Sequence, residues 1–495
     1  MKETMNKSLL NAAWWLLCCT FALLSSAKTT ADPDLWGYMA FGRLFWNTGV
    51  FPYKDVFAYL PTLDLWVYHE WLTGVLFYSI YQTIGAAGLQ VIKYVVLLST
   101  MWLMYLTALR RGADFTSAIT FLFTICVALP TVSSAVRAQI FTYFFFALTL
   151  FIIECVRCSG KKKYLWFIVP VFTLWCNLHG GFVAGLGLIS LYLVGELLNR
   201  NKGFFYLGII FIFTTAATLI NPYGIKYWSY IIKAIIMPRP EITEWSSFYK
   251  AYVTGSISQF EASYYVVVIL FAILLLIWDR NRDIIICLIM AVTLFLGLKN
   301  VRNMFLFLIL IGAYLPVTFK KFLFKMKSDH IIQRVQRFIN YLDWKARCVI
   351  IIFLWFFCFL KLIISNPLSI ELPGTPGISN FYYPVHAVNY IKNKNLSGNL
   401  LTAFNWGEYL LWNLYPRCRV SLDGRYETVY PDHVSREFFD FTFCRGNWRE
   451  FLNKYPPDMI LVESSSTLYS HLKNESAWKQ VYHDSGCALF SRRNN

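Results

Sequence analysis

Acidic residues gather in one stretch of an otherwise apolar chain, from Lys28 to Leu72. Asp32 and Asp34 stand there two positions apart. Two carboxylates at this spacing can share a metal ion, or one can act as a general base while the other adjusts its proton affinity. The structural alternative is that an Asp before LWGYMAFGRLFW caps a helix N-terminus. The spacing alone leaves both interpretations open.

Other polar residues stand at the ends of apolar stretches. Arg137 can bind a phosphate with two parallel hydrogen bonds, or it can be a helix-end residue whose charged head reaches water. Arg302 is the stronger phosphate candidate, because an external Arg runs against the usual preference of basic residues for the cytoplasmic side. His179 precedes two glycines that suit close helix packing, yet polar residues within a membrane are often functional. Glu244, beside Trp245, is a weaker candidate for lining a sugar site.

The composition is that of a polytopic membrane protein. The chain has 495 residues, of which 57% are hydrophobic and 15% are charged, whereas soluble domains contain about 25% charged residues. Apolar runs of about 18 residues recur along it. The net charge of +17 is explained by basic clusters in cytoplasmic loops. No nucleic-acid module is present in the sequence, so nucleic acid is not an expected partner.

The positions of the basic clusters predict the topology. An internal N-terminus agrees with them if Val67–Ile84, rich in Trp and Tyr, lies in the membrane interface instead of crossing. This arrangement gives about 11 transmembrane helices. The predicted crossings are Leu9–Ala27, Leu89–Leu109, Phe115–Ser133, Ala138–Ile153, Tyr164–Leu178, Phe182–Leu198, Phe204–Ile220, Tyr264–Trp278, Ile284–Leu298, Met304–Thr318 and Val349–Ile364. The candidate residues described above then all lie on the outer face.

The composition changes near residue 366. Pro and Gly at 367–377 indicate a linker, and short helices then alternate with buried strands. We therefore predict a transmembrane domain, 1–365, with 28–88 as its first outer loop, and a C-terminal α/β domain, 366–495. Within the latter, Asp423-Gly424 is expected to form a hairpin turn. Cys418, Cys444 and Cys487 are too few for more than one disulfide, and none is expected.

DPDLWGYMAFGRLFWNTGVFPYKDVFAYL and WVYHEWL resemble the first outer loop of bacterial membrane glycosyltransferases of the GT-C superfamily. These enzymes are similar in architecture to the oligosaccharyltransferase catalytic subunit, protein O-mannosyltransferases and the lipid A aminoarabinose transferase. The resemblance extends to VRAQIFTYFFFALTL, LWCNLHGGFVAGLGL, LINPYGIKYW, ITEW and NWGEYLLWNLYPRCRVSLDGR. It implies a GT-C-type polytopic α-helical membrane protein with a small extracytoplasmic C-terminal α/β domain.

The resemblance also implies roles for single residues. An Asp or Glu after the first span is the catalytic carboxylate in that group, so Asp34 is the first candidate for the base and Asp32 the second. Asp55 occupies a position where related sequences often have an acidic residue, although Ala58 replaces an expected Ser. His69 and Glu70 are expected to contact the phosphate or sugar of the donor. For His69, a histidine satisfied by interfacial water is an equal alternative.

Arg137, followed by Ala138 where the family more often has Pro, is expected to hold the lipid phosphate together with Arg302. Trp406, Asp423 and Arg425 resemble fixed features of the related C-terminal domains.

The predicted function is transfer of a hexose or pentose from a polyprenyl-phosphate donor to an extracytoplasmic glycan, lipid or protein, by inverting displacement. The adjacent acids Asp32 and Asp34 permit a divalent metal such as Mg²⁺ or Mn²⁺ but do not require one. The protein is expected in the bacterial inner membrane, in contact with its lipids, with a cytoplasmic N-terminus. A lipid or polysaccharide transporter, or a non-catalytic envelope scaffold, is the alternative; a transporter would more often place charges near the membrane midplane.

Overall fold

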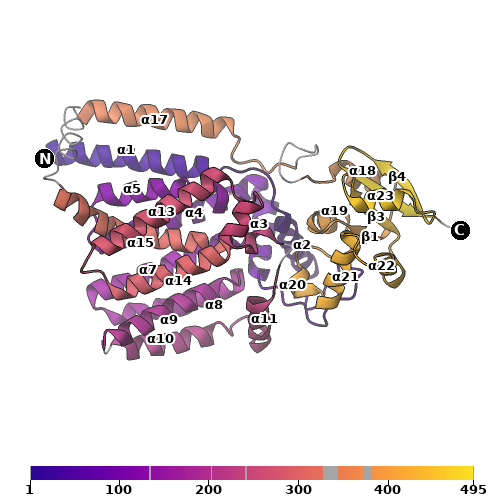
Figure 1. Cartoon of the computed structure of the whole chain (residues 1–495), viewed down its shortest axis with the longest axis horizontal. Helices are drawn as coiled ribbons and strands as arrows, with labels where there is room; N and C mark the ends of the chain where they lie inside the picture. The colour runs from indigo at the N-terminus through magenta and orange to yellow at the C-terminus, as the bar shows by residue number, and fades with distance from the viewer. Residues whose placement is uncertain are drawn as a thin grey trace.

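The computed structural model of the chain describes residues 2–132, 135–201, 203–239, 242–326, 344–372 and 382–493. Its helices form a bundle at one end of the molecule, and a small sheet with surrounding helices forms the other end (Figure 1). The N-terminus lies at the end of the bundle that faces away from the sheet (Figure 1). The chain is therefore a polytopic helical membrane protein with a small C-terminal sheet.

Apolar helices occupy every stretch that the sequence predicts to cross the membrane. Among the described residues, six are long and apolar enough to cross: α1 (Lys2–Ser25), α4 (Ala86–Arg110), α7 (Gln139–Ser159), α13 (Gln259–Trp278), α15 (Met304–Lys325) and α17 (Trp344–Ile364). Shorter helices fill the other stretches: α5 (Phe115–Cys126), α8 (Ile168–Leu178), α9 (Phe182–Leu198), α10 (Gly203–Ala217) and α14 (Ile284–Lys299). The total of about 11 crossings stays a prediction.

Ion pairs show which helix ends lie together. Arg157, near the end of α7, lies 2.8 Å from Asp283 at the start of α14 and 3.5 Å from Glu196 near the end of α9. Arg111, which follows α4, lies 2.5 Å from Glu154 of α7. These ends therefore form one face of the bundle, on the side of the N-terminus (Figure 1). The sequence likewise predicts these basic residues on one side, but which side faces the cytoplasm stays a prediction, and residues 327–343 of the last basic run lie outside the described residues.

Helices α2 (Pro33–Thr48), α3 (Trp71–Ile84) and α11 (Ile225–Ile236) lie between the bundle and the C-terminal part (Figure 1). Helices α2 and α3 can pack closely because Gly42 has no side chain. A Cβ at this position would lie 2.2 Å from the carbonyl oxygen of Gly74 in α3. The 14 residues of α3 span about 21 Å, less than the roughly 30 Å hydrocarbon core. The interfacial placement of this helix stays a prediction. Smaller elements are α6 (Leu129–Val132), α12 (Phe248–Val253), η1 (Lys162–Phe167), η2 (Thr243–Trp245) and η3 (Val301–Asn303).

The C-terminal part contains a five-stranded sheet with strand order β2-β1-β3-β5-β4. Strand β1 (Gly398–Thr402) pairs in parallel with β2 (Cys418–Val420) and β3 (Met459–Glu463). Strand β5 (Cys487–Arg492) runs antiparallel to both β3 and β4 (Trp478–His483). The helices are α18 (Val385–Asn393), η5 (Phe404–Trp406), α19 (Gly407–Leu414), α20 (Tyr426–Val429), α21 (Asp432–Thr442), α22 (Arg449–Lys454) and α23 (Thr467–Lys473). The predicted alternation of helices and strands is confirmed.

One prediction for this part is wrong. Asp423-Gly424 does not join a hairpin, because β2 pairs in parallel with β1 and helix α20 follows the turn. The predicted linker at 373–377 lies outside the described residues, and the domain boundary near 366 stays a prediction. Cys418, Cys444 and Cys487 carry free thiols.

The first outer loop extends the sheet at its β2 edge. Ala58 forms a parallel bridge with Val420, since Val420 donates its N–H to the Phe57 carbonyl at 2.9 Å and Tyr59 donates to the Val420 carbonyl at 3.0 Å. A free strand edge readily accepts another extended segment of chain. The loop that follows α2 is therefore bonded to the C-terminal part, and the two hold the site between them.

Candidate active site

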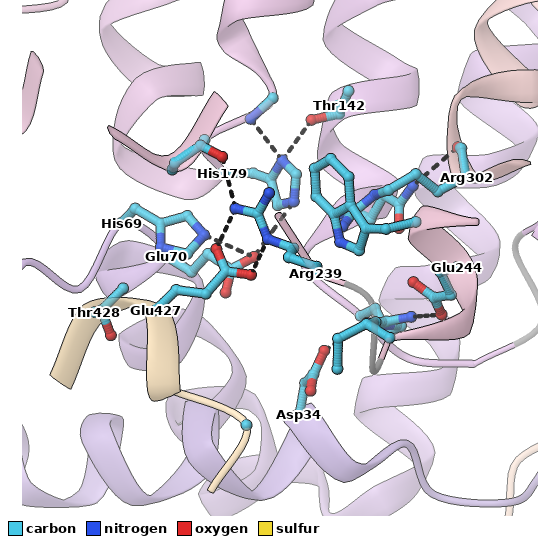
Figure 2. Close-up of a pocket in the computed structure, with 18 of the residues that line it drawn as sticks. Asp34, His69, Glu70, Thr142, His179, Arg239, Glu244, Arg302, Glu427 and Thr428 are labelled. Carbon is cyan, nitrogen blue, oxygen red and sulfur yellow. Dashed lines mark hydrogen bonds and ion pairs between the residues drawn. The ribbon is translucent and has the colours of Figure 1, made fainter. Parts of the chain in front are cut away.

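A cavity of about 300 Å³ lies where the helix bundle meets the C-terminal part. The starts of α2, α7, α9 and α15, together with α11 and the segment from Phe404 to Thr428, form its walls. Figure 2 shows the labelled side chains converging on this space. Of the residues predicted from the sequence, the cavity wall includes Asp34, His69, Glu70, Arg137, His179, Glu244 and Arg302.

The start of α2 explains why both acidic residues occur there. Asp32 is the N-cap, and its Oδ1 accepts the Asp34 backbone N–H at 3.1 Å, while Pro33 occupies the first turn, where its missing N–H costs nothing. Asp34 instead directs its side chain, one-third exposed, into the cavity (Figure 2). Burial raises the pKa of Asp32 to about 7, against the opposing effect of Arg137. The capping interpretation therefore applies to Asp32, and the catalytic interpretation is left to Asp34.

Arg137 binds three carboxylates. Its Nη2 lies 2.5 Å from Oδ2 of Asp34, its Nε lies 3.3 Å from Oδ1 of Asp32, and its Nη1 pairs with Glu244. This guanidinium therefore fixes Asp34 in position and is already engaged on each nitrogen. It also contacts both carboxylates that were candidates for metal ligands. No group of three metal-binding side chains occurs among the described residues, and a divalent metal held by Asp32 and Asp34 stays a prediction.

Trp245 contacts two further cations. The guanidinium of Arg239 lies 4.0 Å from the centre of the Trp245 ring, and that of Arg302 lies 4.5 Å from it. Arg239 also forms an ion pair with Glu427 of α20, with 2.6 Å between Nη2 and Oε2 (Figure 2). Arg302 forms no ion pair with any residue in the described ranges. It is therefore the cavity cation that an incoming anion can bind without breaking an existing pair.

His179 has a defined tautomer. Its Nδ1 accepts the Gly181 backbone N–H at 2.8 Å and lies 2.7 Å from the Thr142 hydroxyl (Figure 2). Because a backbone N–H can only donate, Nδ1 carries no proton, and the hydrogen of the neutral ring is on Nε2. Nε2 lies 3.3 Å from Oε1 of Glu70. Nε2 is thus not available as a metal ligand, and burial, which lowers the pKa of His179, keeps the ring neutral.

Glu70 and His69 complete an uncharged region of the cavity. Burial, with Asp34 nearby, raises the pKa of Glu70 to about 8, so the carboxyl group is largely protonated at neutral pH. Burial also lowers the pKa of His69 to about 4, and its Nδ1 lies 3.2 Å from the Tyr230 hydroxyl. This half of the cavity therefore offers neutral hydrogen-bonding groups. Such groups suit sugar hydroxyls better than they suit a phosphate.

Asp55 lies outside the cavity wall. Its buried carboxylate is 2.5 Å from Nη1 of Arg425, and its Oδ1 accepts the N–H groups of Phe57 and Ala58 at 3.0 and 2.7 Å. Arg425 makes a second, two-point contact with Asp423 at 2.9 and 2.6 Å. These contacts assign Asp55 to the junction between the first outer loop and the C-terminal part.

The sequence did not single out Arg239, Glu408 or Glu427 as site residues. All three line the cavity, the last two from the C-terminal part. Oε2 of Glu408 accepts the Gly37 backbone N–H of α2 at 3.0 Å. The available signal for Glu408 was a carboxylate on an otherwise apolar helix, GEYLLWNL, since such a group is rarely buried without a reason.

No protein-family model and no curated protein matches the chain. Solved structures match its fold. ArnT from Cupriavidus metallidurans in the apo state has 11% identity and a TM-score of 0.53 over 99% of this chain and 98% of that one. The same protein bound to undecaprenyl phosphate has 11% identity and a TM-score of 0.50 over 99% and 97%.

A third match is the Archaeoglobus fulgidus oligosaccharyltransferase in complex with Zn and sulfate. It has 10% identity and a TM-score of 0.54 over 98% of this chain and 73% of that one. Likeness at these identities concerns the fold alone. The predicted resemblance to the GT-C superfamily is confirmed at that level.

Proposed function

We propose that the chain is a membrane glycosyltransferase that moves a sugar from a polyprenyl-phosphate carrier to an extracytoplasmic acceptor. The fold supports this proposal, because nearly the whole chain aligns with ArnT, which was solved with undecaprenyl phosphate bound. The observation that carries the proposal is that two groups line one cavity: the accessible carboxylate of Asp34 and the guanidinium of Arg302. Arg302 has no ion-pair partner among the described residues. Inverting transfer from a lipid phosphate uses a base for the acceptor hydroxyl and a cation for the departing phosphate.

The reaction proceeds in a single displacement. Asp34 accepts the proton of an acceptor hydroxyl, and the hydroxyl oxygen forms a bond to the anomeric carbon of the donor. The bond between that carbon and the phosphate oxygen breaks, and its electron pair leaves with the lipid phosphate. Arg302 balances the charge on the departing phosphate. Arg137 acts as a positioning residue. Its guanidinium is held by Asp32 and Glu244, and it binds Asp34 in turn.

His69, Glu70 and His179 are the proposed sugar contacts. Their groups are neutral at physiological pH, so they offer hydrogen bonds without attracting the phosphate away from Arg302. The sugar is a hexose or a pentose. The protein acts in the bacterial inner membrane, with the basic helix ends in the cytoplasm and the cavity and C-terminal part outside.

The test is transfer by the purified protein, incubated with radiolabelled polyprenyl-phosphate sugars and followed by release of label from the lipid. The wild type is expected to release label, and Asp34→Asn is expected to lose at least about 10²-fold in rate, the usual contribution of a general base. Asp440→Asn is the matched control, because Asp440 is exposed in the C-terminal part. Equal release by wild type and Asp34→Asn would exclude Asp34 as the base. No release with any donor would favour a transporter or scaffold.

A further inference from the structure

A second carboxyl group lies beside Asp34, contributed by the C-terminal part. Glu408 is the second residue of α19, is almost fully buried, and lines the same cavity as Asp34. One of its oxygens, Oε2, accepts the Gly37 N–H at 3.0 Å, so helix α2 holds the carboxyl group in place. Its other oxygen, Oε1, accepts no hydrogen bond from the described part of the chain.

Gly424 shows how close the two acids are. A Cβ built on Gly424 would lie 2.7 Å from Oε1 of Glu408 and 3.2 Å from Oδ1 of Asp34. Both oxygens therefore border the same small space, which exists because residue 424 has no side chain. Oδ1 of Asp34 is likewise without a hydrogen bond from any described residue, since Arg137 binds Oδ2. Two carboxyl oxygens without partners thus face one gap in the cavity wall.

Like-charged groups are not placed in this way for stability alone. Two ionised carboxylates that border one small space repel each other, and a buried carboxyl oxygen without a hydrogen bond, such as Oε1 of Glu408, is costly. Helices α2 and α19 bring them together, although they are more than 370 residues apart in the sequence. An entering hydroxyl group would relieve both, because it can donate to one oxygen and accept from the other when the second acid is protonated.

We propose that Glu408 is a further catalytic residue, and that the acceptor hydroxyl is held between its Oε1 and Oδ1 of Asp34 during transfer. This inference rests on the proposed glycosyltransferase function. The proton of the hydroxyl passes to Asp34 as the oxygen bonds to the anomeric carbon, and the electron pair of the broken bond leaves with the lipid phosphate. Glu408 contributes a hydrogen bond to the acceptor oxygen and gains or loses no atom. The membrane part and the C-terminal part thus supply one acid each.

Gly424→Ala tests the geometry without removing either acid. The added methyl group enters the gap and displaces Oε1 of Glu408, which is the flexible end of its side chain, so the fold is expected to tolerate the change. Transfer should fall about 10²-fold, the cost of misplacing a reacting group by about 1 Å. Gly187→Ala is the matched control, because a Cβ there meets nothing within 4 Å. Its rate should equal that of the wild type.

Binding of undecaprenyl phosphate separates a local effect from misfolding. Gly424→Ala should bind this lipid as the wild type does, because the proposed phosphate contact is Arg302. If the variant does not yield folded protein, Glu408→Gln replaces it, since the amide oxygen can still accept the Gly37 N–H. Glu408→Gln should lower kcat/KM for the acceptor at least about tenfold with an unchanged KM for the donor. Wild-type kinetics in a folded Gly424→Ala, or in Glu408→Gln, would overturn the inference while leaving the proposed function in place.

A protein that releases no sugar from any donor would instead refute the proposed function. The pair is then tested through thermal unfolding of wild type, Asp34→Asn, Glu408→Gln and the double variant. Interacting neighbours give shifts in Tm that do not add, whereas independent groups give additive shifts. Non-additive shifts would support a coupled carboxyl pair, and additive shifts would overturn it.

Discussion

The buried ion triad of Asp55, Arg425 and Asp423 predicts a large effect of one substitution, Arg425→Met. The side chains of Asp55 and Asp423 have no exposed area, and that of Arg425 is 2% exposed. Methionine keeps much of the volume and removes the charge. Two carboxylates then remain buried without the cation that both of them bind, and the junction between the first outer loop and the C-terminal part loses a buried ion pair.

The size of the effect follows from the bonds that are lost. Arg425 makes three charge-assisted hydrogen bonds, at 2.5 Å to Asp55 and at 2.9 and 2.6 Å to Asp423. At about 1.5–3 kcal/mol each, their sum exceeds the roughly 3–5 kcal/mol measured when one partner of a buried ion pair is removed. The smaller figure applies, because the abandoned carboxylates can take up protons. We therefore expect a loss of about 4 kcal/mol.

Thermal unfolding in detergent, followed by tryptophan emission, measures this loss. For a unit of about 150–250 residues, 4 kcal/mol corresponds to a fall in Tm of about 10 °C. Arg445→Met is the control, since the contact of Arg445 with Asp440 is 3.9 Å long and more than half exposed on both sides. Asp55→Asn should cost less than Arg425→Met, because the remaining Arg425–Asp423 pair is neutral and the two backbone N–H groups keep an acceptor. Equal Tm values for Arg425→Met and Arg445→Met would refute the account of this junction.

Three further predictions concern the cavity. Because the pKa of Glu70 is raised, the folded state holds a proton that the unfolded state releases above pH 4.5. Wild-type stability should therefore fall as the pH rises from 4.5 to about 8. Glu70→Gln should remove this part of the pH dependence of Tm. Nitrogen-15 spectra of labelled His179 should show an unprotonated Nδ1 and a protonated Nε2 between pH 6 and 8; a protonated Nδ1 would contradict the hydrogen bond from Gly181. Arg302→Leu should weaken binding of undecaprenyl phosphate about tenfold, the loss of one charge-assisted bond, whereas unchanged binding would move the phosphate site elsewhere.

The sequence was most informative where charge is scarce. In a chain with 15% charged residues, an acid or an Arg at the end of an apolar helix needs a reason to be there, and the positions of the basic clusters assigned such residues to one face. Arg137, His179 and Arg302 were chosen in this way, Asp34 was chosen with the help of the resemblance, and all four line the cavity. Their individual contacts were not predictable, because Arg137 looks the same in sequence whether it binds a phosphate or three carboxylates.

The C-terminal part was harder to interpret for a physical reason. Charged residues are common there, so Glu427 carries no local signal, and Glu408 carries only the weaker signal of a carboxylate on an apolar helix. Arg425 and Asp423 were noticed, but a turn residue beside a glycine suggests a hairpin unless the pairing of the preceding strand is known. Parallel pairing of β1 and β2 depends on contacts distant in sequence, which composition and periodicity do not encode.

The joint construction of the site has a consequence for how its parts depend on each other. Helix α2 presents Asp34, and its Gly37 N–H is bound by Glu408; the loop that follows α2 adds to the edge of β2, and Asp55 in that loop binds Arg425. The Gly37–Glu408 contact therefore joins the two parts and also positions an acid of the cavity. A change that loosens the junction should lower transfer by more than its effect on Tm suggests, because a shift of about 1 Å in Glu408 or Asp34 can cost about 10²-fold in rate. Arg425→Met, assayed well below its Tm, should thus be folded but strongly impaired; full activity in that folded variant would show that the C-terminal part only covers the site.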